Sequence, residues 1–299
     1  MTLVVDSLVK TFGSVRALDG VSFAVGPGEV FGFLGANGAG KTTTMRVCLD
    51  VLRPDSGTVT WEGRPNTTLP RGTWGYLPEE RGLYKKMKVM EQLIFMGELR
   101  GLDKATASKR ARDWCERLQI VEAVHKKTEE LSKGMQQKIQ FIATLLHEPE
   151  LIVMDEPFSG LDPVNASLLQ DTLIEQKKAG KAILFSTHRM DQVEKMCDAI
   201  CLIHRGHAVL QGGMREVKSR YERDHVVINY EGDAGFLQHP AVESFKDYGG
   251  YAEIKLTPGA DSQELLRSAM EKATIFRFEL MEPSLEEIFI RTVGEKIDA

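Results

Sequence analysis

The chain contains 299 residues, of which 42% are hydrophobic and 27% are charged, and its formal net charge is -5. This length exceeds one ordinary domain, so we expect one large and one small domain, each with its own hydrophobic core. The acidic balance argues against a nucleic-acid partner, because a general nucleic-acid binder has a distinctly basic surface.

Two further features of the composition indicate a cytoplasmic protein. No apolar run approaches the roughly 18 residues needed to cross a bilayer, and the initial MTLVVDSLVK lacks the charged and apolar regions of a signal peptide. The cysteines have neither metal-ligand spacing nor the pattern of a disulfide-rich small domain. We therefore expect buried free thiols, as in a reducing compartment, at Cys48, Cys115, Cys197 and Cys201.

The first 63 residues predict strands and one strand-loop-helix unit. Residues 4–25 alternate apolar and polar side chains, which is typical of strands joined by a turn. Residues 28–52 pass from a short apolar strand, through glycines, into a helix. Residues 56–63 form a short strand bounded by turn residues.

The middle of the chain is predicted to be helical and charge-rich from about Glu91 to His147. Ser132 marks the start of one helix, because apolar residues follow it at helical spacing at Met135, Ile139, Ile142 and Leu146. A hydroxyl, unpaired backbone N–H groups and the positive end of the helix dipole suit an anion there. The residues of this helix that follow Ser132, 133–141, carry no acidic side chain.

Further along, two apolar runs end in polar residues. Residues 150–157 and 181–188 therefore predict strands buried in a parallel sheet. Residues 198–213 predict a hairpin that turns at Arg205 and Gly206. His204 and His207 flank this turn, where a solvated hairpin tip is favoured over a metal site.

The sequence changes in texture after residues 215–224. Strand-like segments at 225–230, 251–257 and 274–281 combine with helix-like segments at 261–271 and 284–296. They make a small C-terminal α+β domain of roughly 75 residues, a size within the range of independent domains. We place the boundary near residue 222, giving domains at 1–222 and 223–299.

A phosphate-binding loop is predicted at residues 35–42, because GANGAGKT matches G-x-x-x-x-G-K-[ST]. Small residues let the backbone wrap closely, so that successive N–H groups point at phosphate oxygens. We expect Lys41 to reach the β- and γ-phosphates and the Thr42 hydroxyl to bind Mg²⁺. The residues expected to bind the nucleotide here are Gly35, Asn37, Gly38, Ala39, Gly40, Lys41, Thr42 and Thr43.

Adjacent carboxylates at Asp155 and Glu156 follow the apolar run LIVM. Burying both carboxylates merely for packing costs on the order of several kcal/mol each, because each loses its hydration. A cation or a polar substrate is therefore expected to face them. Neighbours on a strand point to opposite sides, but at the strand's end both can reach one site. We expect Asp155 to bind Mg²⁺ through water and Glu156 to act as the general base for the attacking water.

Taken together, the motifs resemble the ATP-binding subunits of ABC transporters over about residues 2–220. They occur in the family's order: the phosphate-binding loop, then LSKGMQ (131–136), LIVMDEP (151–157), SGLDP (159–163) and STH (186–188). The resemblance implies an α/β P-loop NTPase fold with a mixed sheet core, an antiparallel β subdomain and a helical subdomain at about residues 80–150. It also implies ATP and Mg²⁺ as cofactors.

The partner of the helix that begins at Ser132 follows from this resemblance. In the family, two subunits pack head to tail, and the signature LSGGQ of each caps the ATP on the other's phosphate-binding loop. Ser132 and the N–H of Gly134 are thus expected to hold a partner's γ-phosphate. Lys133 replaces a glycine and Met135 a glutamine of the family pattern. Lys133 either extends its positive charge toward the phosphates or points to solvent. With Met135 in place of the glutamine, the usual polar contact of that glutamine is open to question.

The resemblance also implies roles for single residues in other loops. Asp162 in SGLDP is expected to communicate across the dimer seam. His188 in STH corresponds to the switch histidine, which contacts the γ-phosphate and orients Glu156 or the water. Phe12 in KTFG matches the aromatic residue that stacks on adenine, although by composition alone it suits a core position equally well.

Glu79 stands at the glutamine position of the family's Q-loop. An ionised carboxylate only accepts hydrogen bonds, so Glu79 is expected to face Mg²⁺ or its water shell. The basic residues 81–88 beside it either meet the membrane protein or lipid headgroups, or form a solvated face. The segments YLPEERGLY and LSKGMQQK, with the C-terminal unit ending in EPSLEEIFI, are similar to the sodium- and drug-efflux branch.

The resemblance therefore implies a Mg²⁺-dependent ATPase that powers export. Its expected partners are a second ATP-binding subunit, in a homodimer, and an integral membrane permease, which place it peripherally on the inner face of the cell membrane. The alternative is a soluble ABC ATPase that acts on ribosomes or DNA. The chain has a single cassette, no long heptad insertion and an acidic balance, which argue against that alternative. A P-loop GTPase is also disfavoured, because this sequence lacks the Asn-Lys-x-Asp motif that recognises guanine.

Overall fold

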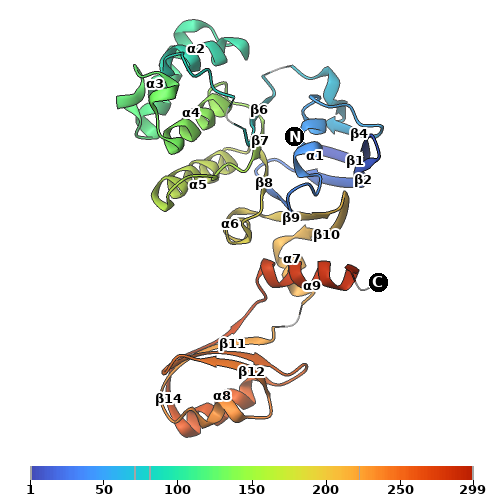
Figure 1. Cartoon of the computed structure of the whole chain (residues 1–299), viewed down its shortest axis with the longest axis vertical. Helices are drawn as coiled ribbons and strands as arrows, with labels where there is room; N and C mark the ends of the chain where they lie inside the picture. Colours follow the sequence, from blue (N-terminus) through green and yellow to red (C-terminus); the bar gives the residue numbers. More distant parts are fainter. Residues whose placement is uncertain (1, 71, 81, 222, 298–299) are drawn as a thin grey trace. The chain divides into compact units, whose positions relative to one another are not determined.

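The computed structural model describes residues 2–70, 72–80, 82–221 and 223–297. They form two compact units, Met1–Met214 and Arg215–Ala299 (Figure 1). This division precedes the boundary that the sequence suggested, and Glu222 itself lies outside the described residues. Tyr221 belongs to the C-terminal unit in this division, and its hydroxyl oxygen lies 2.9 Å from that of Thr292 in the same unit.

An antiparallel sheet opens the first unit, in the strand order β2-β1-β4-β5. Alternating apolar burial stabilises this sheet on one face. In its first strand Leu3 and Val5 are buried, while Val4 between them is exposed. The strands are β1 (Leu3–Phe12), β2 (Val15–Val25), β4 (Ser56–Trp61) and β5 (Arg64–Pro65).

The second sheet of this unit is mixed, in the order β10-β9-β3-β8-β7-β6. Its neighbours pair in parallel except β10, which runs antiparallel to β9 in the predicted hairpin. The strands are β3 (Val30–Leu34), β6 (Trp74–Leu77), β7 (Leu151–Asp155), β8 (Ala182–Thr187), β9 (Ala199–His204) and β10 (His207–Gly213). Because β3, β7 and β8 are buried along their whole length, their sequences do not alternate: they are apolar runs, with polar residues only at the ends of β7 and β8.

Helices cover both faces of the mixed sheet (Figure 1). On one face, α1 (Lys41–Cys48) joins both sheets in one hydrophobic cluster that includes Phe23, Phe33 and Met45. On the other lie α5 (Pro163–Lys178) and α6 (Met190–Met196). A Cβ added at Gly32 of β3 would stand 2.7 Å from the sulfur of Cys197, so glycine lets the end of α6 pack closely on the sheet.

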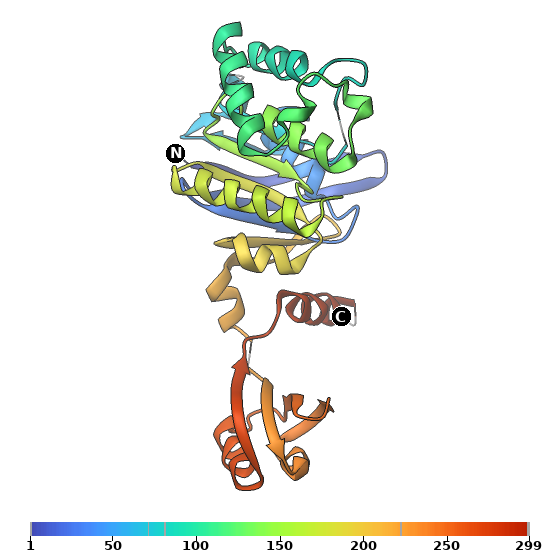
Figure 2. The same ribbon diagram turned by 90° about the vertical axis from the view of Figure 1, so that its left-hand side faces the viewer.

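Three helices form the expected helical subdomain, α2 (Val89–Leu99), α3 (Lys104–Arg117) and α4 (Lys133–Leu145). They pack at one end of the first unit, as Figures 1 and 2 show from two directions. Single 3-10 turns occur at Val121–Ala123 and Thr128–Glu130 in this region, and at Asn66–Thr68. The predicted start of α4 is confirmed, because Ser132 is its N-cap.

The C-terminal unit contains a four-stranded antiparallel sheet in the order β12-β13-β11-β14. Its core joins Val226 and Ile228 of the sheet to Leu265 of α8 and to Phe236 of a 3-10 turn at Ala234–Gln238. The strands are β11 (His225–Gly232), β12 (Val242–Asp247), β13 (Tyr251–Leu256) and β14 (Ala273–Met281), and the helices are α7 (Met214–Ser219), α8 (Ser262–Lys272) and α9 (Leu285–Ile297).

The expected architecture is confirmed: a mixed sheet core with an antiparallel β subdomain and a helical subdomain, and a small C-terminal α+β domain. The cysteines are also free and buried as predicted, at Cys48, Cys115, Cys197 and Cys201. The described residues hold no cluster of side chains able to bind a metal through histidine, cysteine and carboxylates. Within the same ranges, every helix is too short or too polar to traverse a lipid bilayer.

Candidate active site

The loop between β3 and α1 adopts the conformation that its glycines permit. Gly35 and Gly40 have φ of 149° and 116°, which disfavour residues with a side chain. A Cβ at Gly35 would stand 2.3 Å from the carbonyl oxygen of Ile203, and one at Gly40 would stand 2.6 Å from that of Ala17. Both positions therefore require glycine, and α1 begins immediately after them at Lys41.

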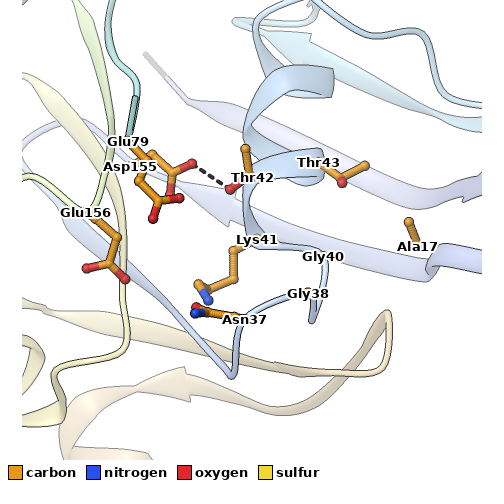
Figure 3. A pocket seen from close by; sticks show the side chains of 10 residues that line it. All are labelled: Ala17, Asn37, Gly38, Gly40, Lys41, Thr42, Thr43, Glu79, Asp155 and Glu156. Carbon is orange, nitrogen blue, oxygen red and sulfur yellow. Dashed lines mark hydrogen bonds between the residues drawn. The ribbon is translucent and has the colours of Figure 1, made fainter. Parts of the chain in front are cut away.

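A cavity of about 350 Å³ lies against this loop (Figure 3). It collects residues from the loop, α1, the end of β7 and the segment after β6. One lining residue, Ala17 of β2, was missed by the sequence analysis, which assigned no role to that strand. The lining consists of Ala17, Asn37, Gly38, Gly40, Lys41, Thr42, Thr43, Glu79, Asp155 and Glu156.

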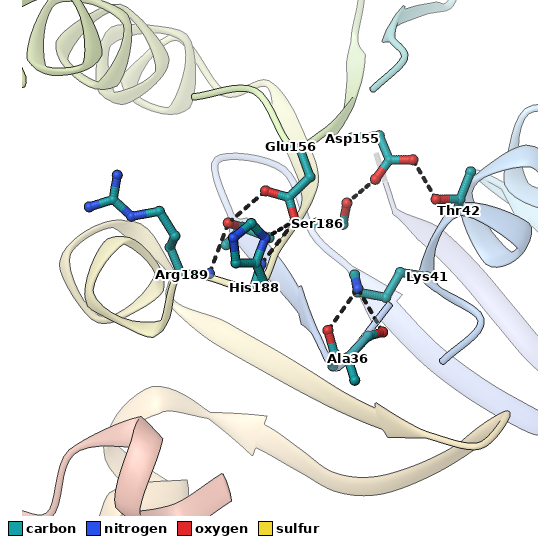
Figure 4. Close-up of polar contacts among 10 residues, drawn as sticks. Ala36, Lys41, Thr42, Asp155, Glu156, Ser186, His188 and Arg189 are labelled. Atoms are coloured by element: carbon teal, nitrogen blue, oxygen red, sulfur yellow. Dashed lines mark hydrogen bonds and ion pairs between the residues drawn. The ribbon is translucent and has the colours of Figure 1, made fainter. Parts of the chain in front are cut away.

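Lys41 is a buried cation at the floor of the cavity, with 7% of its surface exposed. Its Nζ donates hydrogen bonds to the carbonyl oxygens of Gly35 at 2.7 Å and Ala36 at 3.1 Å, which carry no charge (Figure 4). Burial lowers the pKa of Lys41, while the negative charges of Glu156, Asp155 and Glu79 raise it. The ammonium group is thus favourably placed for an incoming anion.

Asp155 is almost fully buried and is held on both oxygens. Thr42 Oγ1 donates to its Oδ2 at 2.6 Å, and Ser186 Oγ donates to its Oδ1. Ser186 was not predicted as a site residue, although it is the first residue of the STH motif. Its hydrogen bond to Asp155 depends on the parallel strand pairing that sets Ser186 opposite Asp155. The hydroxyl of Thr42 and the carboxylate of Asp155 form a set of oxygen donors.

Glu156 enters the same cavity because its backbone turns sharply. Its φ of 49° lies in the left-handed region, so the chain leaves the extended geometry of β7 and does not send the side chain to the opposite face. Glu156 Oε1 accepts hydrogen bonds from the backbone N of His188 at 3.0 Å and from its Nδ1 at 2.8 Å, and Oε2 accepts from Thr187 Oγ1 at 3.1 Å. Since a carboxylate only accepts, Nδ1 carries the proton and Nε2 is available on a ring that is 63% exposed.

Ser132 and Gly134 do not line the cavity of their own chain. Ser132 is exposed, and its Oγ accepts a hydrogen bond from Met135 N at 3.2 Å as the N-cap of α4. A Cβ at Gly134 would only touch Leu161 at 3.6 Å, and the φ of Gly134 is not positive. The packing of this chain therefore does not require glycine there. Lys133 is exposed.

Asp162 and Phe12 also lie outside the cavity lining. Asp162 is the exposed N-cap of α5, and hydrogen bonds from the backbone and side chain of Asn165 lower the pKa of its carboxyl. Phe12 ends β1 with 48% of its surface exposed, which excludes the core interpretation. Lys10 Nζ stands 5.6 Å from the centre of its ring. In the basic segment after Glu79, Arg81 lies outside the described residues.

Two family models match the chain. One, described as ABC transporter, matches residues 18–159, and the other, described as ATP-binding protein DrrA1-3-like, C-terminal domain, matches residues 212–293. The first covers the loop of Lys41, the helix of Ser132 and the carboxylates after β7, and the second covers the C-terminal unit.

Individual relatives align over nearly the whole chain. The uncharacterized ABC transporter ATP-binding protein YhaQ of Bacillus subtilis is 45% identical over 293 residues, which span 98% of each protein. The Nod factor export ATP-binding protein I of Ralstonia nicotianae is 32% identical over 306 residues, 99% of this chain and 94% of that protein. A solved ATP binding subunit of an ABC transporter superposes with a TM-score of 0.69 at 30% identity, covering 74% of this chain and 93% of that chain.

Proposed function

The chain belongs to the ABC transporter ATP-binding proteins, and from this premise we propose that it hydrolyses ATP in the cavity beside Lys41 and thereby powers export through a separate membrane subunit. One observation carries the proposal. The cavity gathers a phosphate-binding loop with its lysine, a hydroxyl bonded to a buried carboxylate, and a second carboxylate bonded to a histidine. Those groups are of the kinds needed to bind a triphosphate and to activate water beside it, and the signature of a second subunit completes the site.

The loop and α1 bind the phosphates. Backbone groups of Gly38 and Gly40 approach the oxygens closely, and the positive end of α1 adds to the attraction. Lys41 exchanges its neutral carbonyl partners for the β- and γ-phosphate oxygens, which compensate its buried charge. Thr43, which lines the cavity one residue further along α1, extends the contact to the α-phosphate side.

Glu156 is the general base. It accepts a proton from the attacking water as the water oxygen bonds to the γ-phosphorus and the bond to the ADP oxygen breaks. His188 holds the Glu156 carboxylate through Nδ1 and presents Nε2 toward the γ-phosphate. Its ring is exposed in the single chain, as expected of a group that contacts a ligand rather than the core.

The donor set of the site fits Mg²⁺, which prefers oxygen ligands. Thr42 Oγ1 and Asp155 Oδ2 already lie within 2.6 Å of each other, and Glu79 lines the same cavity. When bound, the ion neutralises negative charge on the phosphates. Thr42 would hold the ion through its hydroxyl, and Asp155 and Glu79 would hold its water ligands.

The signature residues support a head-to-tail dimer. Ser132 is exposed at the start of α4, and Gly134 carries no side chain although its own chain leaves room for one. Close approach by a ligand from outside explains both features. We assign Ser132, Gly134 and Asp162 to the ATP of a second subunit in a homodimer, and the exposed Phe12 ring to stacking on adenine.

Export is supported by one of the relatives, and a location on the inner face of the cell membrane belongs to the same proposal. The Nod factor export protein matches this chain from end to end, which favours an export permease as the membrane partner. The helical subdomain of α2, α3 and α4 is the part proposed to contact that permease. Action on ribosomes or DNA is disfavoured by the net charge of -5.

The proposal is tested with Glu156→Gln, which keeps the shape of the side chain and removes the base. We expect kcat to fall by about 100-fold or more, because general-base catalysis contributes about that factor, while the Kd for ATP changes little. Glu150→Gln, at the residue immediately before β7, is the matched control and should hydrolyse ATP normally. Hydrolysis by Glu156→Gln at a near-normal rate would remove Glu156 from this role.

A further inference from the structure

The turn at Glu156 is held in an unfavourable conformation. A residue with a side chain at φ of 49° persists only where surrounding contacts impose that conformation. One such contact comes from the mixed sheet, since Glu156 N donates to the carbonyl oxygen of Ser186 at 3.0 Å. A second comes from outside the sheet, at the next residue. Gln137 Nε2 of α4 donates to the carbonyl oxygen of Pro157 at 2.8 Å.

Gln137 is placed for this contact by burial. Only 3% of its surface is exposed, so its amide cannot exchange Pro157 for water without a loss of hydrogen bonding. It belongs to the same helix that Ser132 caps, little more than one turn further along. The neighbouring Gln136 contacts the segment that precedes α4 instead. Its Nε2 donates to the carbonyl oxygens of Thr128 and Leu131.

Two further side chains of α4 contact the segment that carries Glu79. Gln140 Nε2 donates to the carbonyl oxygen of Glu80 at 3.3 Å, and Thr144 Oγ1 donates to that of Tyr76 at 3.2 Å. With Gln137, these side chains tie one face of α4 to main-chain carbonyls near two of the three cavity carboxylates, Glu79 and Glu156. A movement of α4 therefore reaches the cavity through hydrogen bonds as well as through packing.

We propose that Gln137 is a positioning residue for Glu156, and that through it the signature end of α4 is connected to the catalytic carboxylate of the same chain. The inference rests on the proposed function, in which Ser132 and Gly134 contact a partner's ATP and Glu156 is the base. A ligand drawn against the start of α4 shifts that helix. Gln137 then carries the shift to Pro157, and Glu156 moves into or out of its working position.

Three variants test the proposal in the full-length protein. Gln137→Met keeps the approximate size of the side chain and removes the donor. Gln137→Glu removes the donor at neutral pH, but its protonated carboxyl can donate the same hydrogen bond. Lys138→Met is the matched control, because the adjacent Lys138 is also buried and also donates to a carbonyl oxygen, but to that of Leu118 at 2.9 Å and not to one in the turn.

We expect Gln137→Met to lower kcat about tenfold or more with the Kd for ATP within about threefold of the original, which separates a turnover defect from a binding defect. The Hill coefficient for ATP should fall toward one, and Lys138→Met should behave like the unchanged chain. A kcat for Gln137→Met within about twofold of that of Lys138→Met would overturn the proposal.

The Gln137→Glu variant decides the question if Gln137→Met does not fold. Burial raises the pKa of a carboxyl group, so its rate relative to the unchanged chain should rise as the pH is lowered from about 8 to about 6. A ratio that stays flat over this range contradicts the proposal. Glu156→Gln is assayed in parallel. If Glu156→Gln is active, the proposed function fails, whereas an inactive Glu156→Gln beside a fully active Gln137→Met overturns only the role of Gln137.

Discussion

Burial has opposite effects on the ionisable side chains of the first unit, because it disfavours whichever form is charged. It lowers the pKa of Lys41, where nearby carboxylates work against it, and it raises the pKa of the cysteines. The thiol pKa is raised to about 12 for Cys48 and Cys201 and to about 11 for Cys115. Lys41 stays suited to binding phosphate, while the thiols are chemically inert.

The raised pKa values predict that the native protein reacts very slowly with thiol reagents at pH 8. A thiol with a pKa of about 12 is ionised to roughly one part in 10⁴ at that pH, and only the thiolate is nucleophilic. Titration with a chromogenic disulfide should detect almost no reactive thiol until denaturant is added, and then all four. One thiol that reacts within seconds in the folded protein would contradict this.

The limits of residue-level prediction are visible at Asp155. Its role and that of Thr42 follow from local motifs, and both line the cavity as the sequence suggested. Ser186 and Gln137 were not identified, because their partners lie 31 and 20 residues away in the sequence and depend on strand pairing and helix packing. The positive φ of Glu156 was not foreseen either, since no glycine marks it.

Among the elements, α4 and α5 begin at positions with both a structural and a proposed functional role. Ser132 and Asp162 are N-caps, and each is also assigned to the partner's nucleotide. A helix N-terminus offers unpaired N–H groups that a side chain or a ligand can satisfy. The structural role of such a residue can therefore be separated from the functional one only by comparison with a cap elsewhere. Asp103, the N-cap of α3, provides that comparison.

We predict that Asp103→Ala and Asp162→Ala both reduce stability at pH 7, but that only Asp162→Ala impairs ATP hydrolysis. Hydrogen bonds from the side chain and backbone of Thr106 lower the pKa of Asp103, and those from Asn165 lower that of Asp162. A lowered carboxyl pKa contributes stability above the unfolded value of about 4, and that contribution is lost as the pH falls through the folded value.

Urea midpoints and ATPase rates check this pair. The difference in midpoint between each variant and the original chain should shrink as the pH falls below about 4. The kcat of Asp162→Ala should drop by about tenfold, a usual size for coupling between sites, while that of Asp103→Ala should not change. Equal rates for the two variants would leave Asp162 as a cap and nothing more.

Elements with a strong period or a strong motif were predicted well, and elements without one were missed. The strands β3, β7 and β8 begin as unbroken apolar runs, and α4 has apolar residues at helical spacing, so each was identified. In β12, Val242 is only partly buried and the residues after it are exposed, so no alternation appears. In α5, Val164 is 79% exposed, so this apolar residue does not mark a buried helix face. The remaining sign of a helix was its start, where Asp162 is the N-cap and Pro163 the first residue.

At the scale of the whole molecule, the residues assigned to ATP fall into two groups. Lys41, Thr42, Asp155 and Glu156 meet in one cavity, whereas Ser132 and Gly134 do not line it. The resemblance to the family predicted that the signature serves the nucleotide of another chain, and the cavity lining agrees, because it contains neither Ser132 nor Gly134. This separation is the arrangement expected when each complete site is built from the loop of one subunit and the signature of another.

Mixing two inactive variants tests that arrangement directly. Lys41→Ala removes the phosphate-binding lysine, and Gly134→Asp places a negative charge where a phosphate is to bind, so each homodimer should be inactive. In a mixed head-to-tail dimer, one site combines the intact Lys41 loop of one subunit with the intact Gly134 signature of the other. Random mixing makes about half of the dimers mixed, each with one complete site of two, so up to about a quarter of the original ATPase rate should return. A rate no higher than the sum of the separate variants, with mixed dimers verified by differential tagging, would show that each chain builds its site alone.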